Sequence, residues 1–275
     1  MSAICLIDFD SSLYKAAFCA ERTRHTIFFN GAPLLETFSK KEVNIFLKEN
    51  EPHEYTVESE SEVDPIAFAY QNLDSIVEYI LRQTQPDTYE LFLTGKDNFR
   101  DKLATIAPYK GNRDRLKKPY YYHDLYQYAI DKYSATVVDG EEAEDRIGII
   151  NQHREQGDQY LIVHIDKDLD QLAGNHYNPD KDMFYDIGQE EADFYFYCRV
   201  LAGDSVDNVP GVPGLGLKKA DKLLRPFYGN NEELEKQVYA AYLGAGIPSH
   251  FVETAQLVRI RRYENELWSP EYVKI

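Results

Sequence analysis

The chain has 275 residues, and 30 lysines and arginines against 47 aspartates and glutamates give it a formal net charge of −17. Its hydrophobic content of 43% excludes an intrinsically disordered chain. No apolar run is long enough to span a bilayer, no secretion signal opens the sequence, and three cysteines without a CxxC pair argue against disulfides or a zinc site. We therefore expect a soluble, monomeric protein of the cytoplasm that binds no membrane. Its acidity confines any contact with nucleic acid to a local basic surface.

Strand and helix patterns alternate through the first part of the chain. In chain order, strands are predicted at residues 3–7, 25–29, 32–38, 89–94, 135–138 and 160–165. Helices are predicted at residues 11–20, 39–49, 65–80, 120–133 and 139–150, and over most of the chain beyond residue 194. The repeated strand-then-helix order is typical of an α/β fold with a mostly parallel central sheet and helices on both faces.

Residues 25–64 carry two local signals and an acidic run. Asn30-Gly31 supplies the two left-handed positions of a tight hairpin turn. Ser39, with Glu42 three residues later, is typical of a helix N-terminus. Residues 49–64 then hold seven acidic residues and no lysine or arginine, which favours a solvated loop or edge hairpin over a binding tail.

Acidic residues gather where the predicted strands end. They are Asp8 and Asp10; Glu142, Glu144 and Asp145; Asp166, Asp168 and Asp170; and, further along, Asp204 and Asp207. A single acid at such a place is more often a helix N-cap, but the carboxyl ends of parallel strands meet at one edge, so we expect these groups to converge. Two like charges about 4 Å apart repel by roughly 4 kcal/mol at an effective dielectric near 20, so converging carboxylates need cations or abnormal protonation. Oxygen-only ligands suit Mg²⁺ or Mn²⁺, and two such ions can activate water and stabilise the leaving oxygen of a phosphodiester.

A basic segment stands out in this acidic chain. Residues 109–118 (YKGNRDRLKK) hold five basic residues and one acid, and several tyrosines follow closely. One interpretation is a solvated basic loop. The other is a nucleic-acid contact, because aromatic faces stack on exposed bases at roughly 1–3 kcal/mol each. Tyr122 and Tyr126, at helical spacing, are expected to pack in the core instead.

Residues 203–220 join two of the acids to a glycine-rich hairpin. Gly214 and Gly216 permit close approach and positive φ. A helix starting near Leu217 presents free N–H groups to an anion, and Lys218 and Lys219 add positive charge for a phosphate.

Five motifs together resemble those of the 5′-nuclease (flap endonuclease) superfamily, most closely the bacteriophage 5′→3′ exonucleases. They are Leu6-Ile7-Asp8, Tyr109-Lys110-Gly111-Asn112-Arg113, Gly140-Glu141-Glu142-Ala143-Glu144-Asp145, Asp166-Lys167-Asp168 with Gly203-Asp204-Ser205-Val206-Asp207-Asn208, and the Pro213-Gly214-Leu215-Gly216 hairpin. The resemblance covers residues 4–224 and implies a PIN-like α/β domain followed by a helix–three-turn–helix DNA-binding region. The corresponding ranges are residues 1–197, with an insertion at about 21–64 and a helical arch at about 109–128, and residues 198–275.

The resemblance also implies roles for individual residues. The metal ligands of two Mg²⁺ or Mn²⁺ ions would be Asp8, Glu142, Glu144, Asp145, Asp166, Asp168, Asp204 and Asp207. The catalytic residues would be Asp8, Asp145 and Asp168, with Lys110 and Arg113 stabilising negative charge on the scissile phosphate. The DNA-binding residues would be Tyr109, which would stack on a base, Lys110, Arg113, Arg115, Lys117, Lys118, Arg199, Val212, Gly214, Gly216, Lys218 and Lys219. A K⁺ ion would assist the backbone of the glycine hairpin.

The sequence departs from the family pattern in one place. Many relatives carry an aspartate shortly after the strand that precedes the arch, where this chain has Gly95. Two alternatives stay open: Asp97 substitutes from two residues later, or the ligand is absent.

The function implied is a metal-dependent 5′→3′ exonuclease or structure-specific 5′ flap endonuclease that leaves 5′-phosphates, in DNA replication or repair. Its partners would be DNA with 5′ ends, flaps or gaps, and RNA–DNA hybrids. Two other classes compete with this hypothesis. Asp8 and Asp10 also fit the nucleophile and general acid of a haloacid-dehalogenase-type phosphatase. A missing ligand near Gly95 would instead leave a non-catalytic protein that binds branched DNA.

Overall fold

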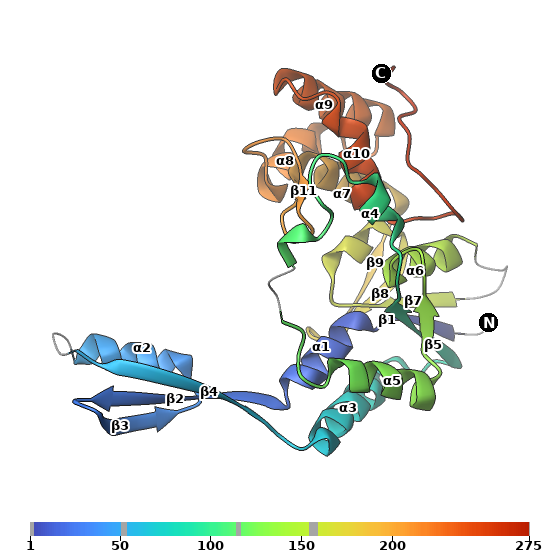
Figure 1. Cartoon of the computed structure of the whole chain (residues 1–275). Coiled ribbons are helices and arrows are strands. Elements are labelled where there is room, and N and C mark those ends of the chain that lie inside the picture. The colour runs from blue at the N-terminus through green and yellow to red at the C-terminus, as the bar shows by residue number, and fades with distance from the viewer. Residues whose placement is uncertain (1–2, 51–53, 114–116, 154–158, 275) are drawn as a thin grey trace. The chain divides into compact units, whose positions relative to one another are not determined.

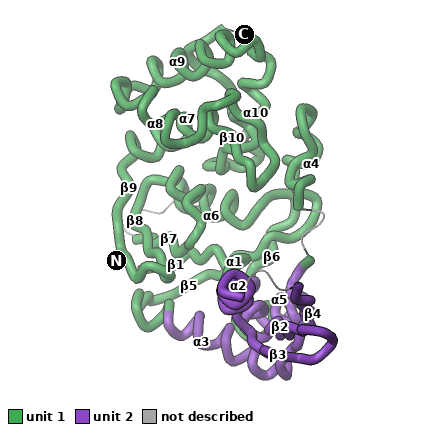
Figure 2. Tube along the Cα trace, turned by 90° about the vertical axis from the view of Figure 1, so that its left-hand side faces the viewer, with its two compact units in different colours: residues 1–11, 80–117, 130–275 green, residues 12–79, 118–129 purple. Residues whose placement is uncertain are grey.

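The computed structural model describes residues 3–50, 54–113, 117–153 and 159–274 (Figure 1). The chain divides into two compact units (Figure 2). Unit 1 comprises residues 1–11, 80–117 and 130–275, and unit 2 comprises residues 12–79 and 118–129.

A six-stranded sheet forms the centre of unit 1. Its strands, in the order in which they lie side by side, are β6 (Thr136–Val138), β5 (Thr88–Thr94), β1 (Ala3–Asp8), β7 (Gln159–Val163), β8 (Gly174–Asn178) and β9 (Met183–Ile187). All neighbouring strands are parallel except β8 and β9, which form an antiparallel hairpin. The expected mostly parallel sheet is therefore confirmed.

The sheet is buried on both faces. Cys5, Leu6 and Ile7 are consecutive residues of β1 that point to opposite faces, and each is at most 1% exposed. On one face, α6 (Ala143–Gln152) packs against β5 and β1, and its Ile147 joins a buried cluster with Leu6 and Phe92. Continuous apolar runs of this kind are what a parallel sheet covered on both sides requires.

A helical region completes unit 1. It contains α7 (Gln189–Ala202), α8 (Leu217–Leu224), α9 (Asn231–Gly244) and α10 (His250–Val258), with the two-stranded ribbon β10 (Gly203–Asp204) and β11 (Val209–Pro210) after α7. The shorter elements are α4 (Phe99–Leu103) and the 3₁₀ turns η1 (Gly111–Arg113), η2 (Lys167–Gln171) and η3 (Arg225–Phe227). Val200, Leu224 and Phe251 lie in one buried cluster, so α7, α8 and α10 share a core. The expected domain boundary between residues 197 and 198 falls inside α7.

Unit 2 contains a small antiparallel sheet that corresponds to the insertion. Its strands are β2 (Glu21–Phe29), β3 (Ala32–Thr37) and β4 (Thr56–Val63), and they lie side by side in the order β3-β2-β4. Helix α2 (Lys40–Glu49) lies between β3 and β4 in the chain. Most of α1 (Asp10–Phe18), α3 (Ile66–Thr84) and α5 (Tyr122–Tyr133) also belongs to this unit. None of the helices among the described residues is long and apolar enough to cross a membrane.

The local signals of the insertion are confirmed. Asn30 and Gly31 adopt φ of 52° and 77° at the β2–β3 turn, and the Ser39 side chain accepts a hydrogen bond from Glu42 N at 3.3 Å. The acidic run becomes β4, an edge strand whose carboxylates face arginines of β2: Arg24 lies 3.0 Å from Glu60 and 3.1 Å from Glu62. This run therefore forms an edge strand of the sheet rather than a binding tail.

Candidate active site

The carboxylates after β1, β6 and β7 lie close enough to perturb one another. Asp8 ends β1, Glu142 precedes the first turn of α6, and Asp166 caps η2. Burial, followed by the charges of Asp10, Asp166 and Glu142, raises the pKa of Asp8 to about 8. A buried acid is charged only at a large desolvation cost, and like charges around it add to that cost. The three strand ends therefore meet as the parallel topology predicts.

A second set of carboxylates continues the same cluster. Burial raises the pKa of Asp168 to about 7, and the charges of Asp166, Asp204 and Asp207 add to this against the opposing effect of Arg199. Burial also raises the pKa of Glu144, and the charges of Glu142 and Asp168 raise it further. The structure thus brings together eight carboxylates: Asp8, Asp10, Glu142, Glu144, Asp166, Asp168, Asp204 and Asp207.

The basic segment supplies cations to this cluster. Lys110 forms an ion pair with Glu142 and lies 3.8 Å from Asp207, and Arg113 pairs with Asp207. The backbone fixes this arrangement, because Lys110 N donates to Asp207 O at 2.8 Å. Burial alone would raise the pKa of Glu142, but Lys110 and the more distant Arg100 lower it to about 2. Lys110 and Arg113 therefore stand at the cluster with their side chains still partly exposed, at 30% and 41%.

Asp145, for which the family pattern implies metal-ligand and catalytic roles, has a full set of hydrogen-bond donors in the structure. Its two oxygens accept from both terminal nitrogens of Arg100, at 2.5 and 2.9 Å, and from Glu142 N and Arg261 N, each at 3.0 Å. A carboxylate offers about four acceptor positions, and all are used here. Both side chains of the pair are at most 1% exposed. We therefore assign Asp145 to positioning: with Arg100 it ties α4 to the start of α6.

Two residues expected to bind DNA are buried instead. Tyr109 is 8% exposed, and its hydroxyl donates toward Asp207 at 3.0 Å and Glu142 at 3.2 Å. Its ring therefore has no free face for a base. Arg199 is 7% exposed, and its guanidinium bridges Asp168, at 2.7 Å, and Asp204. It balances two carboxylates rather than contacting a phosphate in this arrangement.

Asp10, which the family pattern does not assign to the site, is the first residue of α1. Its carboxylate lies against the end of β5. Its oxygens accept from Thr94 N at 3.2 and 3.3 Å. Burial raises its pKa to about 6 despite these hydrogen bonds, and the charge of Glu142 contributes. The sequence pattern already places Asp10, two residues beyond Asp8, among the acids expected to converge at the strand ends.

The neighbouring positions explain why no acid occurs at residue 95. A Cβ atom on Gly95 would lie 2.1 Å from Asp139 Oδ1 and 2.7 Å from Val138 O, so a side chain cannot be added there without moving backbone. Asp97 has a left-handed φ of 62° and an exposed side chain. Of the two alternatives left open for this position, the structure favours neither: Asp97 points to solvent, and the carboxylate near the end of β5 belongs to Asp10.

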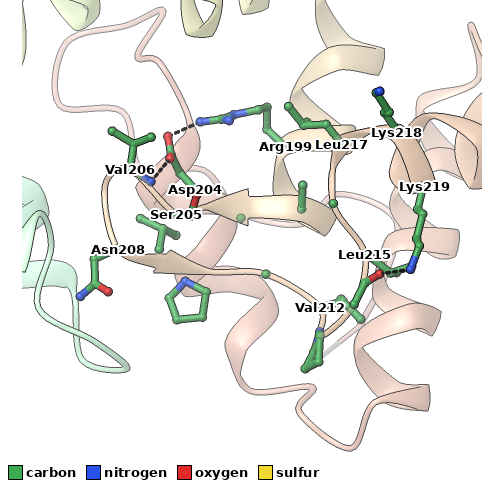
Figure 3. A pocket seen from close by; sticks show the side chains of 18 of the residues that line it. Arg199, Asp204, Ser205, Val206, Asn208, Val212, Leu215, Leu217, Lys218 and Lys219 are labelled. Atoms are coloured by element: carbon green, nitrogen blue, oxygen red, sulfur yellow. Dashed lines mark hydrogen bonds and ion pairs between the residues drawn. The ribbon is translucent and has the colours of Figure 1, made fainter. Parts of the chain in front are cut away.

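The glycine hairpin borders a pocket of about 1160 Å³ that begins at the acidic cluster (Figure 3). Asp204 and Arg199 line one part of it, and Gly214, Lys218 and Lys219 line another. Gly216 precedes α8, as expected, and added Cβ atoms at Gly214 and Gly216 would meet nothing within 4 Å. The backbone here is therefore open to a ligand. Val212, in contrast, is 7% exposed, and its N–H donates to Leu201 O at 2.8 Å.

Three basic residues of the expected arch remain: Arg115, Lys117 and Lys118. Arg115 lies outside the described residues. Lys117 is exposed. Lys118 belongs to unit 2, where its Nζ lies 4.1 Å from the centre of the Tyr122 ring.

Comparison with known proteins finds relatives named 5′-3′ exonuclease, DNA polymerase I and flap endonuclease. No family model matches the chain. A 5′-3′ exonuclease of Buchnera aphidicola (subsp. Schizaphis graminum) is 31% identical over 201 residues, which are 62% of this chain and 67% of the relative. DNA polymerase I of Bacillus subtilis is 32% identical over 169 residues, 52% of this chain but 18% of that protein. The flap endonuclease Xni of Shewanella sediminis is 37% identical over 81 residues, 26% of this chain and 31% of the relative.

Known structures match over almost the whole chain. A mutant of the T5 5′-exonuclease aligns with a TM-score of 0.55 and 13% identity, covering 94% of this chain and 88% of that one. A bacteriophage T5 flap endonuclease in a pseudo-enzyme-product complex with DNA and metal ions aligns with a TM-score of 0.51 and 13% identity, covering 93% of both chains. At this identity the likeness shows the fold, and the exonuclease relative shows the family. The chain belongs to the 5′-nuclease superfamily, and it is a hydrolase of that family.

Proposed function

We propose that this chain hydrolyses DNA phosphodiesters from 5′ ends and at 5′ flaps by means of two divalent ions, Mg²⁺ or Mn²⁺. The observation that carries the proposal is the cluster of eight carboxylates beside Lys110, Arg113 and the glycine pocket. The bacteriophage T5 flap endonuclease of the same fold forms its complex with DNA and metal ions, which supports the same partners here.

The donor set fits hard divalent ions. Burial raises the pKa values of Asp8, Asp10 and Asp168, and the charges of neighbouring carboxylates raise them further. The ligands we propose are Asp8, Asp10, Glu142, Glu144, Asp166, Asp168, Asp204 and Asp207. Carboxylate oxygens are the ligands that Mg²⁺ and Mn²⁺ prefer. When bound, such ions supply Lewis-acid activation of water and of the phosphate.

The basic residues at the cluster would then act on the substrate. Lys110, Arg113 and Arg199 are paired with carboxylates that we assign to the ions. Once the ions neutralise those carboxylates, the partly exposed side chains of Lys110 and Arg113 are free to donate to a phosphate oxygen. Donors held where charge develops in the transition state contribute roughly 10²–10³-fold each to the rate.

Asp10 replaces the aspartate that relatives carry near position 95. Its carboxylate is held at the end of β5 by Thr94 N, beside Glu142. The site therefore keeps a full set of acids although Gly95 has no side chain. This removes the one argument for a non-catalytic DNA-binding protein. The position of Asp10 also disfavours the phosphatase hypothesis, because Thr94 holds this residue within a cluster of acids. In addition, that hypothesis gives no role to Glu142, Glu144 or the glycine pocket.

The glycine pocket is the proposed place for the duplex. The first N–H groups of α8, the open backbone at Gly214 and Gly216, and the side chains of Lys218 and Lys219 can all contact phosphates. We place a K⁺ ion and the downstream duplex there. RNA–DNA hybrids are included among the proposed substrates because nothing in this backbone contact selects the sugar.

The test is cleavage mapping on 5′-labelled blunt, gapped, flap and RNA-primed duplexes, with and without Mg²⁺. We expect Mg²⁺-dependent release of short products with 5′-phosphates. Asp168→Asn and Asp10→Asn should each lower the rate by at least about 10³-fold, because a lost metal ligand should cost no less than a lost oxyanion donor. Retained DNA binding would show that both variants are folded.

Asp97→Asn is the matched control for Asp10→Asn. Asparagine tolerates the left-handed backbone at residue 97, so this variant should fold and cleave like the wild type. Wild-type rates in Asp10→Asn together with a loss in Asp97→Asn would return the ligand to Asp97. Cleavage that is independent of divalent ions would overturn the proposed function.

A further inference from the structure

Two buried histidines and an aspartate form a second cluster, between η2 and the β8–β9 hairpin. His164 Nε2 lies 2.8 Å from His176 Nδ1 and 4.0 Å from Asp170 Oδ1. Tyr185 OH lies 3.2 Å from His164 Nε2 and donates to Asp170 at 2.9 Å. The ligand atoms of the three residues all lie within 4.8 Å of one another.

Backbone carbonyls fix the tautomer of each ring. His164 Nδ1 contacts Asp166 O, and His176 Nε2 lies 2.9 Å from Leu172 O. A carbonyl oxygen only accepts, so each of these nitrogens must carry the ring proton. In the neutral rings the other two nitrogens, His164 Nε2 and His176 Nδ1, are then unprotonated, and they face each other at 2.8 Å. Two lone pairs at this distance repel unless a positive ion lies between them.

A proton is the less favourable candidate for that ion. His164 is 2% exposed and His176 is fully buried, and a buried imidazolium pays a large desolvation cost. Tyr185 has one proton, and the carboxylate of Asp170 is the stronger acceptor for it. A metal ion, in contrast, uses both lone pairs and the carboxylate together.

We propose that His164 Nε2, His176 Nδ1 and the Asp170 carboxylate bind a divalent transition-metal ion of the Zn²⁺ class, at a site separate from the eight-carboxylate cluster. A metal-binding histidine almost always donates its other N–H to a carbonyl or carboxylate, as both rings do here. Tetrahedral ligands at about 2.0–2.1 Å from zinc lie about 3.3 Å apart, so the rings need to separate by about half an ångström. The proposal departs from the expectation, drawn from the cysteine pattern, that the chain has no zinc site, since imidazole and carboxylate ligands need no cysteine.

The site has a path to solvent and an open coordination position. Asp170 and Tyr185 line a cavity of about 700 Å³, and the Asp170 side chain is 31% exposed. Water from this cavity or the Tyr185 oxygen supplies the fourth ligand. The ion would join the segment that carries Asp166 and Asp168 to the β8–β9 hairpin, so its role is to position that segment.

The experiment is equilibrium dialysis of the full chain against Zn²⁺ in excess Mg²⁺, which occupies the all-oxygen sites, followed by metal analysis. Co²⁺ in place of Zn²⁺ gives a visible absorption spectrum that reports tetrahedral nitrogen coordination. We expect one tightly held ion per chain. Asp170→Asn keeps a partner for Tyr185 and should weaken binding at least about tenfold, since even residues that only support a metal ligand contribute 10–100-fold. His176→Ala should abolish the Co²⁺ spectrum.

The matched control is Asp101→Asn, an exposed aspartate on α4 that does not line this cavity and should leave Zn²⁺ binding unchanged. Zn²⁺ binding that is absent in the wild type, or equal in Asp170→Asn and the wild type, would overturn the proposal. A shared proton seen by NMR between the two rings in the presence of Zn²⁺ would also overturn it. Nuclease activity with Mg²⁺ alone is a separate readout, so failure here leaves the proposed function standing.

Discussion

Asp8 and Asp145 are both carboxylates of unit 1 shielded from solvent, Asp8 in part and Asp145 fully, yet their surroundings differ completely. Asp145 accepts two hydrogen bonds from Arg100 and two from backbone N–H groups. Burial raises the pKa of Asp8, and the charges of the surrounding Asp10, Asp166 and Glu142 raise it further. Burial is therefore common to both, and the partners decide the role: a carboxylate with a full set of donors stabilises the fold, whereas one among other acids requires a cation.

The largest expected effect comes from breaking the Asp145 pair. Asp145→Ala leaves the Arg100 guanidinium buried without its partner, which should lower the free energy of unfolding by about 3–5 kcal/mol. Chemical denaturation measures this. Asp8→Asn should cost no comparable stability in metal-free protein, because it removes repulsion.

The double variant Arg100→Met/Asp145→Leu serves as the control for this prediction. A buried ion pair replaced by apolar groups of similar size is often neutral, so the double variant should recover the part of the loss that comes from the unpaired guanidinium. It should not recover all of it, because Glu142 N and Arg261 N still lack the Asp145 acceptor. If Asp145→Ala were as stable as the wild type but inactive, Asp145 would return to the ligand set.

The stability of the metal-free protein should depend on pH because of Asp8. The pKa of Asp8 in the folded chain is about 8, above its ordinary value of 3.8. The folded state therefore holds this proton more tightly than the unfolded state. The resulting stability is fully present below pH of about 4 and is lost as pH rises toward about 8.

Denaturation of metal-free protein at several pH values between 4 and 8 measures this loss. Asp8→Asn should reduce the slope, and adding Mg²⁺ should reverse it for the wild type, because the ion favours the ionised carboxylates. An identical pH profile for Asp8→Asn and the wild type would mean that Asp8 is not protonated in the folded chain.

The smallest expected effect concerns Tyr109, which bridges two acids of the cluster. Tyr109→Phe removes the hydroxyl that donates toward Glu142 and Asp207, and hydrogen bonds to charged groups contribute about 1.5–3 kcal/mol. In metal-free protein, the free energy of unfolding should fall by the lower end of that range. With Mg²⁺ it should fall by less, because the ion gives the acids another partner. A larger loss with Mg²⁺ than without it would contradict the idea that the ions replace donors already present.

Much of the fold follows from local sequence signals. The apolar runs before Asp8 and Asp166 become parallel strands, and Asn30-Gly31 turns the hairpin of the insertion. The β8–β9 hairpin was not predicted, because its residues include asparagine, histidine and aspartate, which are rare in strands, and its stability comes from pairing with β7. Helix α4 is too short for a periodic pattern, and Arg100 within it finds its partner 45 residues away.

The sequence by itself determined the family, the mostly parallel sheet and the gathering of acids at strand ends, because the direction of parallel strands places their carboxyl ends at one edge. Only the tertiary structure decided which acids remain without donors. It paired Asp145 with Arg100, buried Tyr109 and Arg199, and held Asp10 against Thr94. It also turned the lone pairs of His164 and His176 toward each other. Such roles depend on contacts between residues distant in the chain, and side-chain chemistry at one position does not reveal which partner the fold will bring to it.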